Sequence, residues 1–207
     1  MDSCFEDITI EFLGVAFYNI LYHTSVYPKN VFETRRKYNV VVYNCVHPEV
    51  VEYINMCLKS IRECLKIGEV HSVVFSVTDS TYKPVINFVF DIRKLDEYND
   101  TTDAYLIQVE QNLRAYILGL ACNSDKFKCL PEDCSFSINI HTNESTAVNI
   151  STNPCLEDFP LVEINHDGEE ADACVLPLRS FPLRGFQLET YIVITCSEFP
   201  NIAGFEN

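Results

Sequence analysis

The chain has 207 residues and carries 30 Asp and Glu against 15 Lys and Arg, a formal net charge of -15. Residues 129–178 contain no Lys or Arg at all. Because such a surface repels a phosphate backbone, this balance argues against direct binding of nucleic acid. With 47% hydrophobic and 22% charged residues and only 6 Gly, the chain is typical of one folded domain.

The N-terminal segment is acidic, with Asp2, Glu6, Asp7 and Glu11 where a secretory leader would need positive charge and an uninterrupted apolar run. No segment reaches the run of about twenty apolar residues that spans a bilayer. We therefore expect a soluble intracellular protein with no membrane contact. Ten Cys are present, and several lie in apolar patterns, which predicts reduced and buried thiols.

Three stretches have helical periodicity. Residues 3–25 repeat apolar side chains at steps of three and four, and Tyr27-Pro28 ends that helix. The second helix begins at Pro48, which suits a first helical position, and Gly68 is placed to stop it. The third spans residues 102–121. The predicted apolar stripes of the second and third helices are Val51, Ile54, Leu58, Ile61 and Leu65, and Leu106, Val109, Leu113, Ile117 and Leu120.

Five strands are expected. Residues 70–78 and 84–92 are joined by the turn-rich "DSTYKP" and predict an antiparallel hairpin, while 134–142 and 186–195 are further strands. The basic stretch "VYPKNVFETRRKYNV" is interpreted as a loop that runs into a short strand at 38–43. This order predicts an α+β fold with helices packed on one face of an antiparallel sheet.

Residues 143–184 break the pattern, because they are long, acidic and interrupted by four prolines. A connection of this length without its own secondary structure is unusual inside a compact domain. The clear strand that follows suggests that the segment leaves the core and pairs elsewhere.

No nucleotide-binding loop or hydrolase elbow is present, and no cofactor is implied. Cys129 and Cys134 with His141 form a weak zinc hypothesis, and core thiols are the simpler account. Cys45 and His47 are the one nucleophile pair to consider, although His47 can equally cap the helix at Pro48. Tyr27 and Tyr53 are instead the first candidates for an aromatic groove that receives a proline-bearing peptide.

Several separate motifs carry a resemblance: "EFLGVAFYNILYHTSVYPKNVF", "KYNV", "HPEVVEYI", "NLRAYIL", "CSFSINIHT", "DFPLV" and "LPL". In this order and spacing they resemble the HORMA domain family, and within it the small, non-catalytic subunits of translesion DNA polymerase zeta. The resemblance implies a single HORMA domain over residues 1–207. It would consist of a core at 1–142, a safety belt with its closing strand at 143–196, and a tail at 197–207.

The resemblance also implies partners. The safety belt would trap a proline-containing peptide of the catalytic subunit of polymerase zeta, with Tyr27, Tyr53, Pro160 and Leu161 at the peptide. Val175, Leu176, Glu189 and Tyr191 match a surface for the C-terminal domain of the translesion deoxycytidyl transferase. Leu161 and Glu189 depart from the Trp and Gln of relatives.

Arg114 matches a helix position used for homo- or heterodimers of HORMA domains, although an Arg on a helix face can also be merely solvated. The implied compartment is the nucleus, with the cytoplasm as a second one. Two alternatives stay open: a HORMA protein of the spindle-checkpoint type, and a Cys-dependent hydrolase that uses Cys45 and His47.

Overall fold

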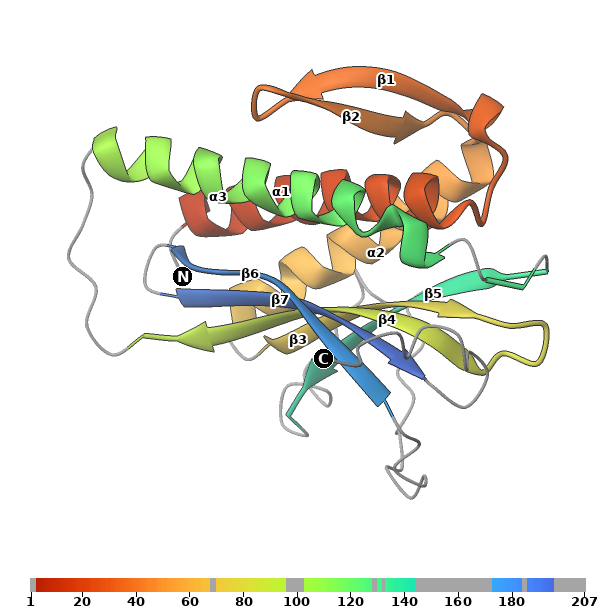
Figure 1. Cartoon of the computed structure of the whole chain (residues 1–207). Helices are drawn as coiled ribbons and strands as arrows, with labels where there is room; N and C mark the ends of the chain where they lie inside the picture. The colour runs from red at the N-terminus through yellow and green to blue at the C-terminus, as the bar shows by residue number, and fades with distance from the viewer. Residues whose placement is uncertain are drawn as a thin grey trace, which may run out of the picture.

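A computed structural model of the chain describes residues 3–67, 70–95, 103–127, 130–131, 133–143, 173–183 and 186–195. Three helices lie over one face of a five-stranded antiparallel sheet, and a two-stranded sheet lies on the far side of the helices (Figure 1). The helices are α1 (Ser3–Thr24), α2 (Pro48–Ile67) and α3 (Asp103–Cys122). This arrangement confirms the predicted α+β fold.

The large sheet has the strand order β5-β3-β4-β7-β6, and every neighbouring pair is antiparallel. Its strands are β3 (Val70–Thr78), β4 (Pro84–Lys94), β5 (Ser135–Thr142), β6 (Ala173–Leu183) and β7 (Phe186–Thr195). The predicted hairpin β3–β4 and the strands β5 and β7 are confirmed within two residues at each end. Among the described residues, β5 and β6 are the two outer strands.

The core lies between the helices and the sheet. Phe12 of α1 packs edge-on against Phe90 of β4 and Tyr116 of α3, with ring centroids 6.1 and 4.9 Å away. These side chains are fully buried. Alternate residues of each strand point to this side, as the period of two along a strand requires. The inward side chains of the two central strands are Val73, Phe75, Val77, Ile86, Phe88, Phe90 and Ile92.

Most residues of the apolar stripes predicted for α2 and α3 are buried. Ile54, Ile61 and Leu65 of α2 are buried, and Cys57 and Cys64 lie beside them as buried free thiols. Val51 and Leu58 are only half-buried. On α3, Val109, Leu113, Ile117 and Leu120 are buried, but the expectation for Leu106 was wrong, since it is 44% exposed. The buried residue in this turn is instead Tyr105, which lies four residues before Val109 on the same helix face.

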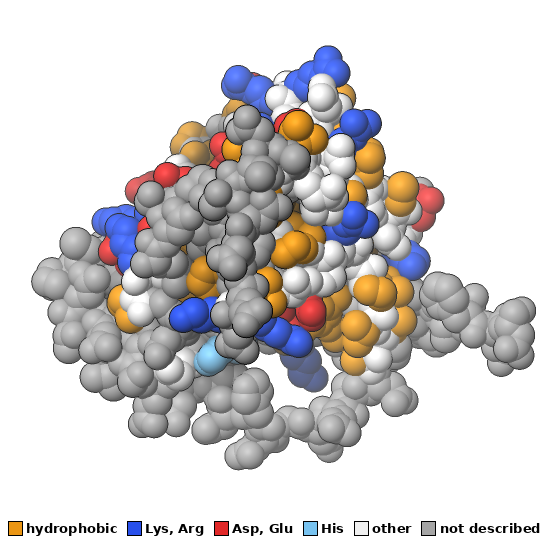
Figure 2. Space-filling view, turned by 90° about the vertical axis from the view of Figure 1, so that its left-hand side faces the viewer, with side chains coloured by type: hydrophobic (Ala, Val, Ile, Leu, Met, Phe, Trp, Pro, Cys, Tyr) orange, Lys and Arg blue, Asp and Glu red, His pale blue; other side chains and the backbone are white. Residues whose placement is uncertain are grey.

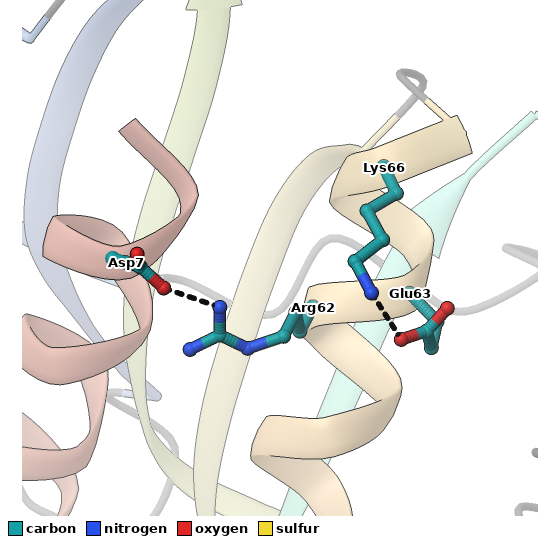
Figure 3. Close-up of polar contacts among 4 residues, drawn as sticks. All are labelled: Asp7, Arg62, Glu63 and Lys66. Atoms are coloured by element: carbon teal, nitrogen blue, oxygen red, sulfur yellow. Dashed lines mark hydrogen bonds and ion pairs between the residues drawn. The ribbon is translucent and has the colours of Figure 1, made fainter. Parts of the chain in front are cut away.

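Helices α1 and α2 are joined near the start of α1 by an ion pair. Arg62 Nη1 lies 2.5 Å from Asp7 Oδ1, and Lys66 pairs with Glu63 one turn apart on α2 itself (Figure 3). The Asp7 carboxylate is mostly exposed. Such exposed pairs contribute little to stability, about 0–1 kcal/mol each.

The basic stretch is not a loop. After a short helical turn, η1 (Lys29–Val31), strand β1 (Phe32–Lys37) pairs with β2 (Val40–Cys45) as a separate hairpin. Tyr38 and Asn39 form its two-residue turn with φ of 49° and 59°, the backbone shape of a type I′ turn. The predicted strand at 38–43 is confirmed as β2 but lies two residues too early, because Tyr38 and Asn39 form a turn that lacks the usual Gly signal.

A second correction concerns residues 173–183, which were expected to belong to an irregular excursion and instead form β6. Pro177 and Pro182 obscured the strand in the sequence. Both are tolerated because β6 is an outer strand, where a residue without an N–H removes no bond to a further strand. The pairing with β7 shifts register between Pro177 and Arg179, which is a β-bulge.

Within the described helices, none is both long and apolar enough to cross a membrane.

Candidate functional site

The outer strand β5 carries an aromatic cluster near its first residues. Phe136 stacks on Phe75 of β3 at 5.1 Å, and the rings of Tyr27 and Tyr53 approach it edge-on at 6.1 and 5.4 Å. Tyr27 follows the end of α1, where Ser25 has a φ of 57°, and Tyr53 projects from α2. The structure therefore brings the two predicted peptide-binding tyrosines to the same ring.

The Tyr53 hydroxyl accepts a hydrogen bond from the backbone N–H of Ile138 on β5, with an N to O distance of 3.4 Å. Burial raises the pKa of Tyr53 to about 12, and burial also raises the pKa of Tyr27. Both rings thus stay neutral at physiological pH. Tyr53 holds α2 against the outer strand and meets a backbone donor of that strand.

Within the described part of the chain, strand β5 pairs only with β3 and is an outer strand of the sheet. An outer strand presents a row of backbone N–H and C=O groups that can pair with an added strand. A peptide laid along β5 would extend the sheet, and its side chains would meet the cluster of Tyr27, Tyr53 and Phe136. The site is a strand edge with an aromatic wall.

Residues 143–172 connect β5 to β6, which lies at the opposite edge of the same sheet. Four strand spacings separate the two edges, roughly 19 Å. A segment of this length has far more reach than the crossing needs. Pro160 and Leu161, the other two predicted peptide-binding residues, lie outside the described residues.

The predicted transferase-binding residues lie on β6 and β7. Val175, Glu189 and Tyr191 are on the face of the sheet away from the helices, and Val175 is 57% exposed. Leu176 is the exception, because it pairs with the buried Ile192 and packs against the core. A cavity of about 520 Å³ opens beside this surface, lined in part by Pro177, Ser180 and Tyr191.

Charged groups fix the orientation of Tyr191. Its hydroxyl donates to Asp91 Oδ2 at 3.1 Å, and Arg93 lies 3.7 Å from Asp91 and 3.4 Å from Glu189. Burial raises the pKa of Tyr191, and the neighbouring Asp91 carboxylate raises it further. Tyr191 is thus a neutral donor held in place by a ladder of alternating charge on β4 and β7.

Arg114 is exposed on α3, on the same side as two exposed apolar residues. Ile107 is 59% exposed and Leu118 is 45% exposed. The spacing of seven and four residues places both on the helix face that carries Arg114. The structure does not bring Arg114 to the aromatic cluster.

The structure gives little support to the two other hypotheses from the sequence, a Cys45–His47 nucleophile pair and a zinc site. Cys45 is 1% exposed at the end of β2, and the His47 ring lies 6.4 Å from that of Tyr27. His47 instead lies at the cap position just before α2, and its carbonyl accepts the N–H of Val51 at 3.0 Å. Cys129 lies outside the described residues, and the part of the chain that is described holds no group of three or more metal-ligating side chains.

Two features of the site were missed in the sequence. Phe136 was not singled out, although the alternation of "CSFSINIHT" places it, Ile138 and Ile140 on one strand face. The contact of Asn112 with Arg179, which attaches β6 to α3, joins residues 67 positions apart and gives no local signal.

Comparison with known proteins agrees with this geometry. The chain is 33% identical over 187 residues to the human mitotic spindle assembly checkpoint protein MAD2B, covering 90% of this chain and 89% of the relative. DNA polymerase zeta subunit 2 of Drosophila melanogaster is 24% identical, with 90% of this chain and 96% of the relative covered.

Among solved structures, a chain of the mitotic checkpoint complex superimposes with a TM-score of 0.77 at 19% identity, covering 91% of this chain and 97% of that chain. HTP-2 of C. elegans bound to a HIM-3 closure motif superimposes with a TM-score of 0.66 at 11% identity, covering 91% and 89%. A profile of the HORMA domain matches residues 7–158. The chain therefore belongs to the HORMA domain family of non-catalytic adaptor proteins.

Proposed function

We propose that this protein is the adaptor subunit of translesion DNA polymerase zeta and that it captures a proline-containing peptide of the catalytic subunit along the outer edge of β5. The observation that carries the proposal is the edge strand flanked by Tyr27, Tyr53 and Phe136. The name of the Drosophila relative and the closure motif bound to HTP-2 support it.

Backbone pairing with β5 would supply affinity that depends little on sequence, and the aromatic cluster would supply selectivity. Proline lacks an N–H, so at a position whose N–H would point away from β5 it costs no bond to the strand. Its ring packs well on an aromatic face. Tyr27 and Tyr53 are therefore the residues that we expect to discriminate proline from polar residues.

The connection from β5 to the opposite edge of the sheet would slow dissociation of the captured peptide. A peptide on β5 would lie inside a loop of the protein's own chain that includes Pro160 and Leu161. Release would then require part of that loop to move as well as the contacts to break. This additional step lowers the dissociation rate. We propose a long-lived complex of modest contact area.

The surface of Val175, Glu189 and Tyr191 would bind the C-terminal domain of the translesion deoxycytidyl transferase. It lies on β6 and β7, while the peptide edge is β5, so both partners can bind at once. One HORMA domain would thereby join the polymerase to its scaffold during DNA damage tolerance. This role places the protein in the nucleus, with the cytoplasm as a second compartment.

The exposed face of α3 would form contacts between HORMA domains. Arg114 lies between the exposed side chains of Ile107 and Leu118. Apolar side chains around a central Arg are a common composition for the centre of an interface. If the chain dimerises through this face, Arg114→Ala will shift the mass measured by light scattering from dimer to monomer.

Affinity purification of the full chain followed by mass spectrometry tests the proposal directly. We expect the catalytic polymerase subunit among the captured proteins from wild type and its loss from Tyr53→Ala. A peptide array of that subunit should then locate one proline-bearing segment. Capture that is unchanged by Tyr53→Ala would refute the β5 site.

A second candidate is a checkpoint protein that traps checkpoint peptides, which the fold match to a mitotic checkpoint complex chain favours. The same purification separates the two, because each predicts a different client. Recovery of checkpoint proteins without the polymerase would favour the second candidate.

A further inference from the structure

The hairpin β1–β2 encloses, together with α1 and α2, a cavity of about 330 Å³ that the peptide edge does not use. Its walls are mostly apolar and include Ile10 and Val15 of α1, Val42 of β2 and Leu58 of α2. Gly14 deepens it, because a Cβ at that position would meet Leu58 Cδ1 at 3.2 Å. A large apolar side chain from another molecule has room to enter.

The cavity is held open by fixed contacts. The Tyr38 hydroxyl donates to Glu11 Oε1 at 3.3 Å, and Lys37 Nζ lies 2.9 Å from Glu11 Oε2. Tyr43 N–H donates to Asn19 Oδ1 at 3.3 Å, so both strands are tied to α1. The Asp7–Arg62 pair lies one helical turn farther along α1 and α2 (Figure 3). The site is preformed, and a ligand would not have to order it.

The rim of the cavity is basic in a protein of net charge -15. Arg35, Arg36 and Lys37 all line it, and Lys and Arg side chains gather in the upper part of Figure 2, where the hairpin lies. Arg35 pairs with Glu33 and Lys37 with Glu11. Arg36 donates to the Asn39 amide oxygen at 3.2 Å and forms no ion pair within the described residues. Its charge is available to an incoming anion.

We propose that this cavity is a second docking site, which binds a short acidic segment of a partner protein that carries one bulky apolar side chain. The apolar side chain enters between Val42 and Leu58, and flanking Asp or Glu side chains pair with Arg36 and its neighbours. Nucleic acid would satisfy the charges but has no apolar side chain for the cavity, and the acidic remainder of the chain repels it.

The test is a fluorescence polarisation titration of the full chain with a labelled nine-residue peptide, in which a central Phe is flanked by Asp and Glu. We expect saturable binding that weakens as salt is added. A peptide with Ser in place of Phe, and the variant Arg36→Glu, should each weaken binding at least about tenfold. Leu58→Gln tests the apolar wall, with the melting temperature measured alongside.

Lys83→Glu is the matched control, because Lys83 is exposed in the β3–β4 turn and the change in net charge is the same. It should leave binding of the acidic peptide nearly unchanged, as should Tyr53→Ala, which affects only the β5 edge. Equal losses in Lys83→Glu and Arg36→Glu would overturn the proposal. So would the absence of saturable binding at millimolar peptide concentration.

Two further outcomes would show that the cavity binds something other than an acidic peptide. Binding of an oligothymidine probe as tight as that of the peptide, with no effect of replacing Phe, would show a site for nucleic acid and overturn the peptide assignment. A dimer in light scattering that Arg36→Glu dissociates would assign the cavity to a second copy of this chain. The peptide assignment is supported if Arg36→Glu weakens peptide binding while Lys83→Glu does not, and if the peptide with Ser in place of Phe binds more weakly.

Discussion

Arg179 on β6 and Asn112 on α3 form a two-pronged contact, in which Nε and Nη2 of Arg179 donate to Asn112 Oδ1 at 3.2 and 2.7 Å. Asn112 is buried, at 4% exposed, whereas Arg179 is exposed, so the contact lies at the boundary between the core and solvent. Thr190 on β7 completes it, since its hydroxyl accepts the Arg179 N–H at 3.1 Å and donates to the Arg179 carbonyl at 2.8 Å. One arginine thus joins α3, β6 and β7.

Replacing Asn112 by Leu should destabilise the attachment of the β6–β7 hairpin. The substitution removes the acceptor of both guanidinium N–H groups, and because the exposed guanidinium can then bind water, the cost is that of a net hydrogen bond, about 0.5–1.5 kcal/mol. We expect the free energy of unfolding in urea to fall by this amount. Hydrogen exchange measured by mass spectrometry should rise in residues 173–183 and 186–195 more than in β3.

Ser180→Ala is the control for this change. Ser180 lies on the same strand and accepts a hydrogen bond from Gln187 at 2.6 Å, but that contact is exposed. Its removal should change stability by less than about 0.5 kcal/mol. Equal effects of the two substitutions would show that the contact between Asn112 and Arg179 has no special role in holding the hairpin.

The elements that the sequence predicts well are those with a single apolar face. Strand β7 alternates between buried Leu188, Ile192 and Ile194 and half-exposed neighbours, so period and length agree. Strand β1 has four exposed residues in succession and no such signal, because it belongs to a hairpin outside the main sheet. Its existence depends on pairing with β2 and on contacts of Tyr38 and Lys37 with Glu11.

The candidate site likewise contains some residues that the sequence predicts and others that it does not. Tyr27 and Tyr53 could be proposed from their aromatic character and their positions at element ends, and they do meet at one ring. Their shared neighbour Phe136 comes from β5, which is distant in the sequence. The inward turn of Leu176 depends on the register of β6 with β7 and on the bulge beyond Pro177. The bulge interrupts the alternation along β6, so the residues of this strand alone do not show which of them face the core.

Tyr53 allows the ring and the hydroxyl to be tested separately. Tyr53→Ala removes an aromatic surface worth about 1.5–3 kcal/mol, so peptide affinity should fall at least about tenfold. Tyr53→Phe keeps the ring and frees the Ile138 N–H that the hydroxyl now accepts. That N–H is then available to a peptide carbonyl, and affinity should stay equal or rise.

Isothermal titration with the peptide found in the array measures both variants. Thermal unfolding of each variant without peptide checks that the fold is intact. A loss in Tyr53→Phe as large as that in Tyr53→Ala would mean that the hydroxyl itself binds the peptide, contrary to the ring-packing account.

The thiols should differ sharply in reactivity. Cys45, Cys57 and Cys64 are buried, whereas Cys122 is exposed. Burial also raises the pKa of Cys57 and Cys64 to about 11, which lowers the thiolate fraction at neutral pH. In the native protein, iodoacetamide should modify Cys122 at least about tenfold faster than these three, as followed by peptide mass spectrometry. Rapid modification of Cys45 would revive its interpretation as a nucleophile.

His23 should make stability depend on pH. Burial lowers the pKa of His23 to about 4, and the nearby Lys29 charge lowers it further. Its ring lies among Tyr22 and Tyr43, with centroids 5.3 and 5.7 Å away. The unfolded chain, with a His pKa near 6.5, therefore binds a proton between about pH 6.5 and 4 while the folded chain does not. Stability from this residue is present above pH 6.5 and is lost as pH falls toward 4.

Because His23 is only partly buried, we expect the loss to be on the order of 1–2 kcal/mol after allowance for solvent screening. Acidic residues also titrate in this range, so the quantity to measure is the difference between wild type and His23→Gln in urea unfolding at several pH values. Gln carries no charge at any of them. The stability of wild type relative to the variant should fall between pH 6.5 and 4 and then level off. Parallel curves for the two proteins would show that His23 keeps an ordinary pKa and that its aromatic neighbours do not desolvate it.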